Sequence, residues 1–305
     1  MISRNIIYSL IAFTMISLFA CAKYSPPSSN TERISVSASI FPIYDITRQI
    51  AGTKIDVHLL IKPGESPHTF EPTFNTKKNV NNSKKLFIIG HQIDDWATTI
   101  VDNKLKVTII DSDIFFLESN MDEHQSNKTQ NHKHEKFNPH YWLDPSNGIQ
   151  IAKNIKEELI NIDSKNSNYY EDNFQIFKKS IDILFAELTS QSTEIQQVSF
   201  ITLHQAWIYY ANAFNLNVVG SFEPEAAEEP SPKYLKELQD KIKLEKVSII
   251  FSEPQLSTTS LSGFIKDNNL RIGILDPIGG SKDISSYQKL LQHNMDTLTR
   301  ELKEN

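Results

Sequence analysis

The chain has 305 residues, enough for two domains of ordinary size or one large one. Its composition, with 39% apolar and 22% charged residues, predicts a folded core. With 31 basic and 37 acidic side chains the net charge is −6, so nucleic acid, which needs a basic face, is not expected as a partner. A mean hydropathy of −0.37 excludes a multi-span membrane protein, and a single Cys excludes an internal disulfide framework.

Residues 1–21 are predicted to be a lipoprotein signal peptide. Arg4 precedes a short apolar run, which is typical of a secretory signal and too short for an ordinary transmembrane helix. The only cysteine, Cys21, follows directly, and its surroundings resemble the lipobox at which bacterial lipoproteins are cleaved and acylated. We therefore expect a lipid anchor at Cys21, with an ordinary signal peptide as the alternative. The polar, Pro- and Ser-rich residues 22–33 suit a flexible stalk.

Eight short runs rich in Ile, Val and Leu are predicted to be strands, four in each half of the chain. Continuous apolar runs followed by helical patterning favour parallel strands buried on both faces and joined by helical crossovers. We therefore predict an α/β fold with two lobes, each a roughly four-stranded parallel sheet flanked by helices. The predicted strands span residues 34–40, 55–61, 85–89, 106–110, 198–203, 216–219, 247–251 and 270–275.

Between the two halves the pattern becomes helical. We predict a helix that Ser146 caps and that continues to Ile160, and a second helix from about Ser167 to Gln197 without internal Pro or Gly. Apolar residues recur along the second helix at three- to four-residue spacing, which predicts one buried stripe on a helix about 45 Å long. We expect this long helix to join the two lobes rigidly. The predicted stripe comprises Ile176, Phe177, Ile181, Leu184, Phe185 and Leu188.

A polar insertion without apolar periodicity spans residues 121–136 and contains three histidines, His124, His132 and His134. These either gather metal ions weakly or belong to a solvated loop. The predicted parts of the chain are the signal peptide 1–21, the stalk 22–33, the N-terminal metal-binding lobe 34–162, the linking helix 163–197 and the C-terminal metal-binding lobe 198–305.

Metal-capable side chains occur next to predicted strand ends, two in each lobe. Open parallel sheets bind ligands beyond the carboxyl ends of their strands, so these side chains could converge on one cleft between the lobes. Three imidazoles and one carboxylate make a tetrahedral set of zinc ligands. The four candidates are His68 after strand 55–61, His140 before the first long helix, His204 after strand 198–203, and Asp276 after strand 270–275.

The motifs SPHTFEP, NPHYWLDP, LHQAW and LDPIGG, in this order, resemble the ZnuA/TroA-like (cluster A-I) metal-binding lipoproteins of bacterial ABC importers for zinc and manganese. The resemblance covers about residues 34–302. It implies two α/β lobes, one rigid joining helix, and a metal held between the lobes by His68, His140, His204 and Asp276. It also implies a non-enzymatic receptor, anchored in the periplasm or at the outer surface, that serves a permease with a cytoplasmic ATPase. We expect a monomer.

The third ligand position bears on the choice of metal. Family members that prefer manganese tend to carry a carboxylate there, whereas this chain has His204. Imidazole suits Zn²⁺ better than the harder Mn²⁺, so we expect zinc. The histidines of the insertion favour the same choice. Manganese, or both metals, stays open as the alternative.

Two acidic residues near the ligands could accept the second N–H of an imidazole, Glu71 near His68 and Glu253 after strand 247–251. For Glu253 a helix-capping role is the alternative. Because metal binding needs neutral imidazoles, we expect affinity to weaken as the pH falls toward the ordinary histidine pKa of about 6.5.

Two other classes of protein are considered. A secreted zinc hydrolase would keep an open coordination position, but no His-Glu-x-x-His run is present and four protein ligands would close the site. A receptor for a siderophore, haem or corrinoid would need a larger pocket than four convergent small ligands provide.

Overall fold

The computed structural model describes residues 33–118, 137–223, 230–259 and 261–303. The chain separates into two compact units, residues 1–33 and 34–305, and the description below concerns the second. The predicted signal peptide, the stalk up to residue 32, Cys21, and the insertion histidines His124, His132 and His134 lie outside the described residues.

The first sheet has four parallel strands in the order β2-β1-β3-β4. Its two central strands are almost wholly buried, as expected for a parallel sheet covered on both faces. The strands are β1 (Ser35–Ala38), β2 (Asp56–Leu59), β3 (Lys85–Ile88) and β4 (Val107–Ile109), and the helices between them are α2 (Phe41–Ala51), α3 (Phe74–Asn82) and α4 (Ala97–Ile100).

The second sheet repeats this pattern with the order β6-β5-β7-β8, again all parallel. The predicted α/β fold with two four-stranded parallel sheets is therefore confirmed. The strands are β5 (Phe200–His204), β6 (Val218–Glu223), β7 (Ile249–Ser252) and β8 (Arg271–Ile274), and the helices are α7 (Ile208–Phe214), α8 (Pro232–Leu244), α9 (Leu261–Asn268) and α10 (Tyr287–Lys303). Short 3-10 helices are η1 (Lys104–Lys106), η2 (Tyr141–Leu143), η3 (Ser164–Asn166) and η4 (Gln205–Trp207).

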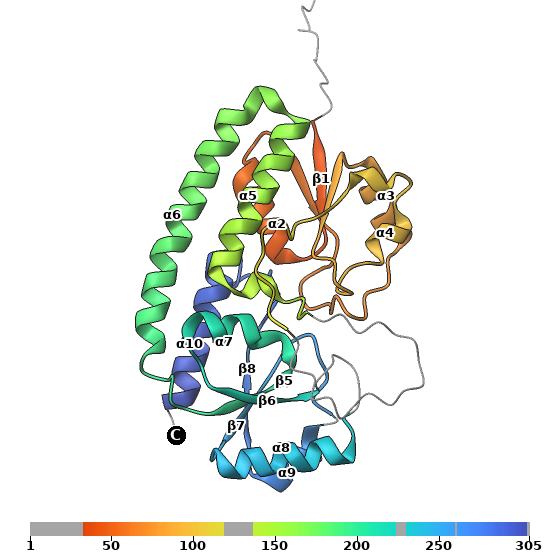
Figure 1. The fold of residues 1–305 in the computed structure, drawn as a ribbon. Coiled ribbons are helices and arrows are strands. Elements are labelled where there is room, and N and C mark those ends of the chain that lie inside the picture. The colour runs from red at the N-terminus through yellow and green to blue at the C-terminus, as the bar shows by residue number, and fades with distance from the viewer. Residues whose placement is uncertain (1–32, 119–136, 224–229, 260, 304–305) are drawn as a thin grey trace, which may run out of the picture. The chain divides into compact units, whose positions relative to one another are not determined.

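Two helices, α5 (Pro145–Ile162) and α6 (Ser167–Ser192), join the sheets, and Figure 1 shows α6 running beside α5 and α10. The predicted cap at Ser146 is wrong. Asp144 caps α5 instead, because its side chain accepts a hydrogen bond from the backbone N of Ser146 at 2.7 Å. Pro145 fits the first helical position, where no backbone N–H is needed.

The apolar stripe of α6 is narrower than predicted. Phe177, Ile181 and Leu188 are buried, and Leu184 and Phe185 pack partly buried against the core. Ile176, however, is 69% exposed. Consecutive helical residues point about 100° apart, and here Phe177 faces the core while Ile176 points to solvent.

The main hydrophobic core contains residues from both sheets and from α5, α6 and α10. At its edge, the fully buried Asp45 of α2 accepts a hydrogen bond from the backbone N of Tyr287, the first residue of α10, at 2.8 Å. The hydroxyl of Tyr287 donates to the carbonyl oxygen of Trp142 at 2.6 Å. The C-terminal helix is thus fixed to two elements of the first half of the chain.

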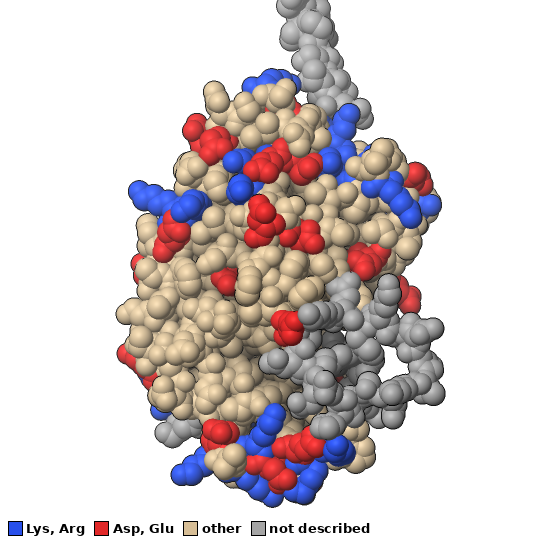
Figure 2. Space-filling view, viewed as in Figure 1, with Lys and Arg blue, Asp and Glu red and all other residues tan. Residues whose placement is uncertain are grey.

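Charged side chains of both signs are interspersed on the face shown in Figure 2. Among the described residues, none of the helices combines the length and the apolar character needed to cross a bilayer.

Candidate metal centre

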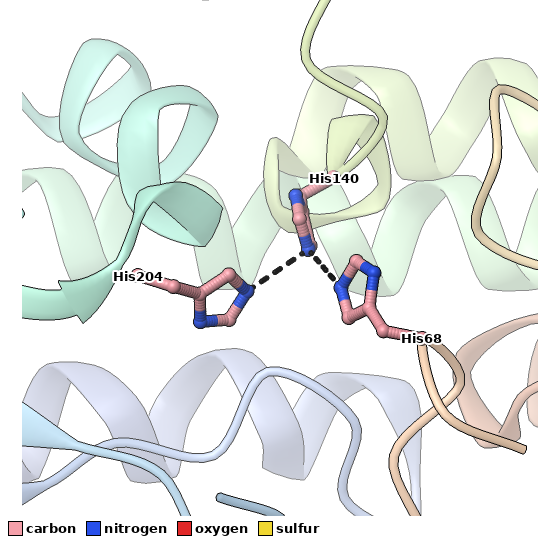
Figure 3. A group of neighbouring side chains, drawn as sticks. All are labelled: His68, His140 and His204. Carbon is pink, nitrogen blue, oxygen red and sulfur yellow. Dashed lines mark hydrogen bonds between the residues drawn. The ribbon is translucent and has the colours of Figure 1, made fainter. Parts of the chain in front are cut away.

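Three of the four predicted ligands lie together in the structure. His68 lies in the loop after β2, His140 directly precedes η2, and His204 is the last residue of β5. Their imidazoles converge from three segments (Figure 3), with His140 Nε2 at 3.4 Å from His68 Nε2 and 3.3 Å from His204 Nε2. All three possible ligand atoms lie within 4.8 Å of one another.

These nitrogen separations match a tetrahedral zinc shell. Zinc binds imidazole nitrogen at about 2.0–2.1 Å, so two nitrogens on neighbouring corners of a tetrahedron lie about 3.3–3.4 Å apart. The two distances from His140 Nε2 have these values. Two of the three nitrogen pairs are therefore already spaced as they would be around one zinc ion.

Asn138 fixes the orientation of His140. The side-chain oxygen of Asn138 lies 3.0 Å from Nδ1 of His140, while the Asn138 amide nitrogen donates to the carbonyl oxygen of Gln205 at 2.6 Å. Since an amide oxygen only accepts hydrogen bonds, the proton of the neutral imidazole lies on Nδ1. The lone pair of Nε2 is then free to face the centre of the cluster.

Glu253 faces the outer nitrogen of His204. Its Oε1 lies 2.7 Å from Nδ1 of His204 and accepts a hydrogen bond from Nε1 of Trp207 at 3.2 Å. The arrangement follows from the sheet, because β5 and β7 are neighbours and their carboxyl ends are adjacent. By contrast, Glu71 is exposed and, in the described part of the chain, makes no hydrogen bond to His68.

Asp276 lies beyond β8 and is buried, but it is not part of the cluster of three histidines. Its Oδ1 accepts hydrogen bonds from Nε2 of Gln255 at 2.8 Å and from the backbone N of Ile278 and Gly279 at 3.0 and 2.9 Å. The role of Asp276 as the fourth ligand therefore stays a prediction.

The space at the cluster is small. A cavity of about 10 Å³ is lined by the three histidines, Glu253 and Gln255 together with mostly apolar neighbours. A volume of about 10–15 Å³ holds one water-sized sphere. The cavity fits a single ion and not a siderophore, haem or corrinoid.

Burial keeps the imidazoles of His68 and His140 neutral. It lowers the pKa of His68 to about 3, and the neighbouring His204 acts in the same direction. Burial, followed by His204 and then His68, also holds the pKa of His140 well below its usual range. Because both groups stay unprotonated well below pH 6.5, proton competition at these two ligands begins at a lower pH than the sequence led us to expect.

Comparison with known proteins shows what the chain resembles. The family model ZnuA, zinc-uptake complex component A, periplasmic, matches residues 36–301. The manganese ABC transporter substrate-binding lipoprotein PsaA of Streptococcus anginosus is 27% identical over 97% of this chain and 97% of its own length. The iron ABC transporter substrate-binding lipoprotein MtsA of Streptococcus pyogenes serotype M1 is 28% identical over 96% of this chain and 98% of its own length.

The structure of the laminin-binding protein Lmb of Streptococcus agalactiae, a bifunctional protein with adhesin and metal-transporting activity, is 26% identical. The two structures superpose with a TM-score of 0.75, and the superposed part covers 88% of this chain and 99% of the Lmb chain.

Two parallel α/β sheets, a long joining helix and a buried cluster of imidazoles define a metal-binding receptor of an ABC importer. Since the family model spans nearly the whole second unit, the chain belongs to the ZnuA family. This family consists of substrate-binding proteins of transporters, which confirms that the chain is not an enzyme and sets the hydrolase alternative aside.

Sequence reasoning missed two residues at the site. Asn138 precedes His140 by two positions, a spacing at which Asn side chains commonly bond to the backbone, so a local signal existed. Gln255 offers no such signal, because its bond to Asp276 depends on β7 and β8 being neighbours in the sheet.

Proposed function

We propose that the protein captures Zn²⁺ outside the cytoplasmic membrane and delivers it to an ABC permease driven by a cytoplasmic ATPase. Nε2 of His68, His140 and His204 supply three ligands, and a carboxylate oxygen of Asp276 supplies the fourth. The spacing of the three nitrogens carries the proposal, since two separations of 3.3 and 3.4 Å are those of a tetrahedral zinc shell.

The chemistry of the donors supports zinc over manganese. Three neutral nitrogen donors suit Zn²⁺, whereas Mn²⁺ prefers oxygen donors and more ligands. Manganese is the second candidate, because PsaA of S. anginosus is named as a manganese transporter lipoprotein. MtsA of S. pyogenes serotype M1 is named as an iron transporter lipoprotein. Relatives with these names make the metal the first point to test.

Of the two acidic residues considered as partners of an imidazole, only Glu253 is part of the proposed site. Glu253 holds the proton of the His204 imidazole on Nδ1 and so leaves the Nε2 lone pair for the metal, which the 2.7 Å distance between Oε1 and Nδ1 supports. Glu71 has no such contact and is not proposed to orient an imidazole.

The remaining parts of the chain serve anchoring and capture. An acylated Cys21 tethers the receptor to the membrane, in keeping with relatives that are lipoproteins. Residues 22–33 form the stalk, and His124, His132 and His134 gather Zn²⁺ weakly. The proposed domain bounds are 34–162, 163–197 and 198–305, and the receptor acts as a monomer.

The test is a thermal-unfolding titration of the chelator-stripped protein with Zn²⁺ and with Mn²⁺. A metal at about 100-fold excess over its Kd stabilises the folded protein by about 2.7 kcal/mol. We expect a larger shift with Zn²⁺ than with Mn²⁺, and its loss in the His140→Ala variant. The matched control is His58→Ala, because His58 is exposed on β2. Equal shifts for both metals would refute the preference for zinc, and no shift with either metal would refute metal capture.

A further inference from the structure

The residues that lead into the strands of the first sheet form a basic edge. Parallel strands all begin at the same edge of a sheet, and the backbone N of Lys84 donates to the carbonyl oxygen of Ser35 at 2.7 Å, so β3 begins beside β1. The segments leading into β2, β3 and β4 hold five basic and two acidic side chains, in a chain whose net charge is −6. These segments, called the basic edge below, are residues 52–56, 83–85 and 102–106.

Three of the five lysines of the basic edge have no acidic partner. Lys54, Lys84 and Lys104 are exposed, and none of them forms an ion pair with a carboxylate of the described residues. Next to Lys104, the apolar side chain of Leu105 is 86% exposed. The other two lysines are already bonded within the protein, Lys85 to Glu158 and Lys106 to the carbonyl oxygen of Asn81.

The opposite edge of the same sheet has the reverse charge. The segments that follow β2, β3 and β4 hold four acidic side chains and one basic one. An anionic surface would therefore attract one edge of the sheet and repel the other. The loop that carries His68 begins at this acidic edge. The acidic edge comprises residues 60–64, 89–95 and 110–114.

The chain enters the body at the basic edge. Ile34 directly precedes β1, and the twelve residues 22–33 link it to Cys21, the proposed lipid anchor. A chain of this length spans at most about 40 Å even when fully extended. At the end of the molecule where β1 begins in Figure 1, Figure 2 shows basic side chains with some acidic ones among them. An anchored receptor therefore keeps its basic edge within reach of the lipid headgroups.

We infer that the basic edge docks the body of the receptor on anionic phospholipid headgroups. Each lysine held close to such a surface strengthens binding about fivefold, and an exposed apolar side chain such as Leu105 can enter the headgroup region. Docking in this orientation turns the acidic edge, and with it the start of the His68 loop, away from the bilayer and toward the medium that supplies the metal. The inference rests on the proposed function for the anchor at Cys21.

The test uses the lipid-anchored chain in vesicles of phosphatidylcholine alone or of equal parts phosphatidylcholine and phosphatidylglycerol. A spin label on Asn82→Cys, exposed at the end of α3, reports on the basic edge, and one on Ser112→Cys, also exposed, reports on the acidic edge. Relaxation by a lipid-soluble agent measures contact with lipid. We expect contact for the Asn82→Cys label on the anionic vesicles only, and none for the Ser112→Cys label. High salt should abolish the contact, because it screens exposed charges.

The combined substitutions Lys54→Gln, Lys84→Gln and Lys104→Gln are expected to lower the ratio of docked to undocked receptor about 100-fold. The matched control carries the same loss of charge on three exposed lysines of the second half of the chain and should keep the lipid contact. It consists of Lys241→Gln, Lys243→Gln and Lys246→Gln.

The outcomes separate the inference from the proposed anchor. If the wild type attaches to neither kind of vesicle, the anchor and the docking surface both fail. Attachment to the anionic vesicles alone refutes the anchor and supports the basic edge. If the wild type attaches to both kinds but the Asn82→Cys label reports the same contact on each, the inference fails alone, as it does if contact survives the loss of the three lysines.

Discussion

The indole Nε1 of Trp142 donates a hydrogen bond to the carbonyl oxygen of Pro277 at 2.8 Å. Trp142 lies two residues after His140, and its ring packs 5.2 Å from that imidazole, while Pro277 directly follows Asp276. One bond thus joins the loop of a histidine ligand from the first half of the chain to the loop of the proposed carboxylate ligand.

Trp142→Phe is expected to weaken this connection. The variant leaves the buried carbonyl oxygen of Pro277 without its donor, which costs about 1–3 kcal/mol of the free energy of unfolding. Urea denaturation of the metal-free protein measures the loss. Trp96→Phe is the control, because Nε1 of Trp96 is buried but has no hydrogen-bond partner in the described part of the chain. Equal losses in the two variants would show that the bond to Pro277 contributes nothing.

Glu253→Gln is expected to reduce zinc affinity about 10- to 100-fold, the usual effect of losing a group that orients a ligand imidazole. Oε1 of Glu253, 2.7 Å from Nδ1 of His204, strengthens the donor character of that ring, and an amide oxygen does so less. Competition titration with a zinc chelator gives the affinity. Glu71→Gln, at an exposed position, should leave it unchanged. An unaltered affinity in Glu253→Gln would contradict the role of Glu253.

The metal-free protein is expected to lose stability as the pH falls from 6.5 to 3. In the unfolded chain His68 takes up a proton near its ordinary pKa of about 6.5, whereas burial keeps it neutral in the folded protein until about pH 3. Acid therefore favours the unfolded chain, and the contribution of His68 at pH 5 is about 2 kcal/mol. His140 acts in the same direction.

Urea denaturation at pH 7.5 and pH 5 tests this expectation in the wild type and in His68→Gln, which cannot titrate. The variant should show a smaller loss between the two pH values than the wild type. The same loss in both proteins would mean that His68 is not held neutral by burial.

Gly148→Ala is expected to destabilise the protein although alanine favours helices. A Cβ at Gly148, in α5, would lie 2.3 Å from the hydroxyl oxygen of Tyr287, which is fully buried. Such overpacking costs about 1–3 kcal/mol. Gly263→Ala in α9 is the matched control, because nothing lies within 4 Å of its added Cβ. There the free energy of unfolding should rise by about 0.5–1 kcal/mol, because alanine favours helix more than glycine does, and the thermal midpoint should rise with it. A rise in both variants would refute the packing argument.

The sequence was sufficient to predict the two sheets, because most of their strands coincide with short runs of Ile, Val and Leu. The run at 34–40, for example, contains β1, Ser35–Ala38. Histidines at strand ends could likewise be recognised, since the carboxyl edge of a parallel sheet is where ligands bind. His204, the last residue of β5, is such a case.

Details that depend on neighbours in space could not be predicted. The sequence leaves Glu253 open as an acceptor for an imidazole or as a helix cap. That it faces His204 follows from the strand order β5-β7, which no local pattern encodes. The exposure of Ile176 depends on which side of α6 faces the core, and spacing alone admitted it to the stripe. The predicted cap of α5 is wrong for a different reason: the helix begins at Pro145, which makes Asp144 its N-cap.

The buried link between Asp45 and Tyr287 limits how the receptor can unload. A hinge motion that separated the two halves would break the hydrogen bond from the backbone N of Tyr287 to Asp45. It would also break the hydrogen bonds between Gln49 and Gln288. His68 is the least enclosed of the three imidazoles and sits on a loop, not at the end of a central strand. We therefore expect release of the proposed cargo to begin with movement of this loop, while Asp45 and Tyr287 keep the two halves joined.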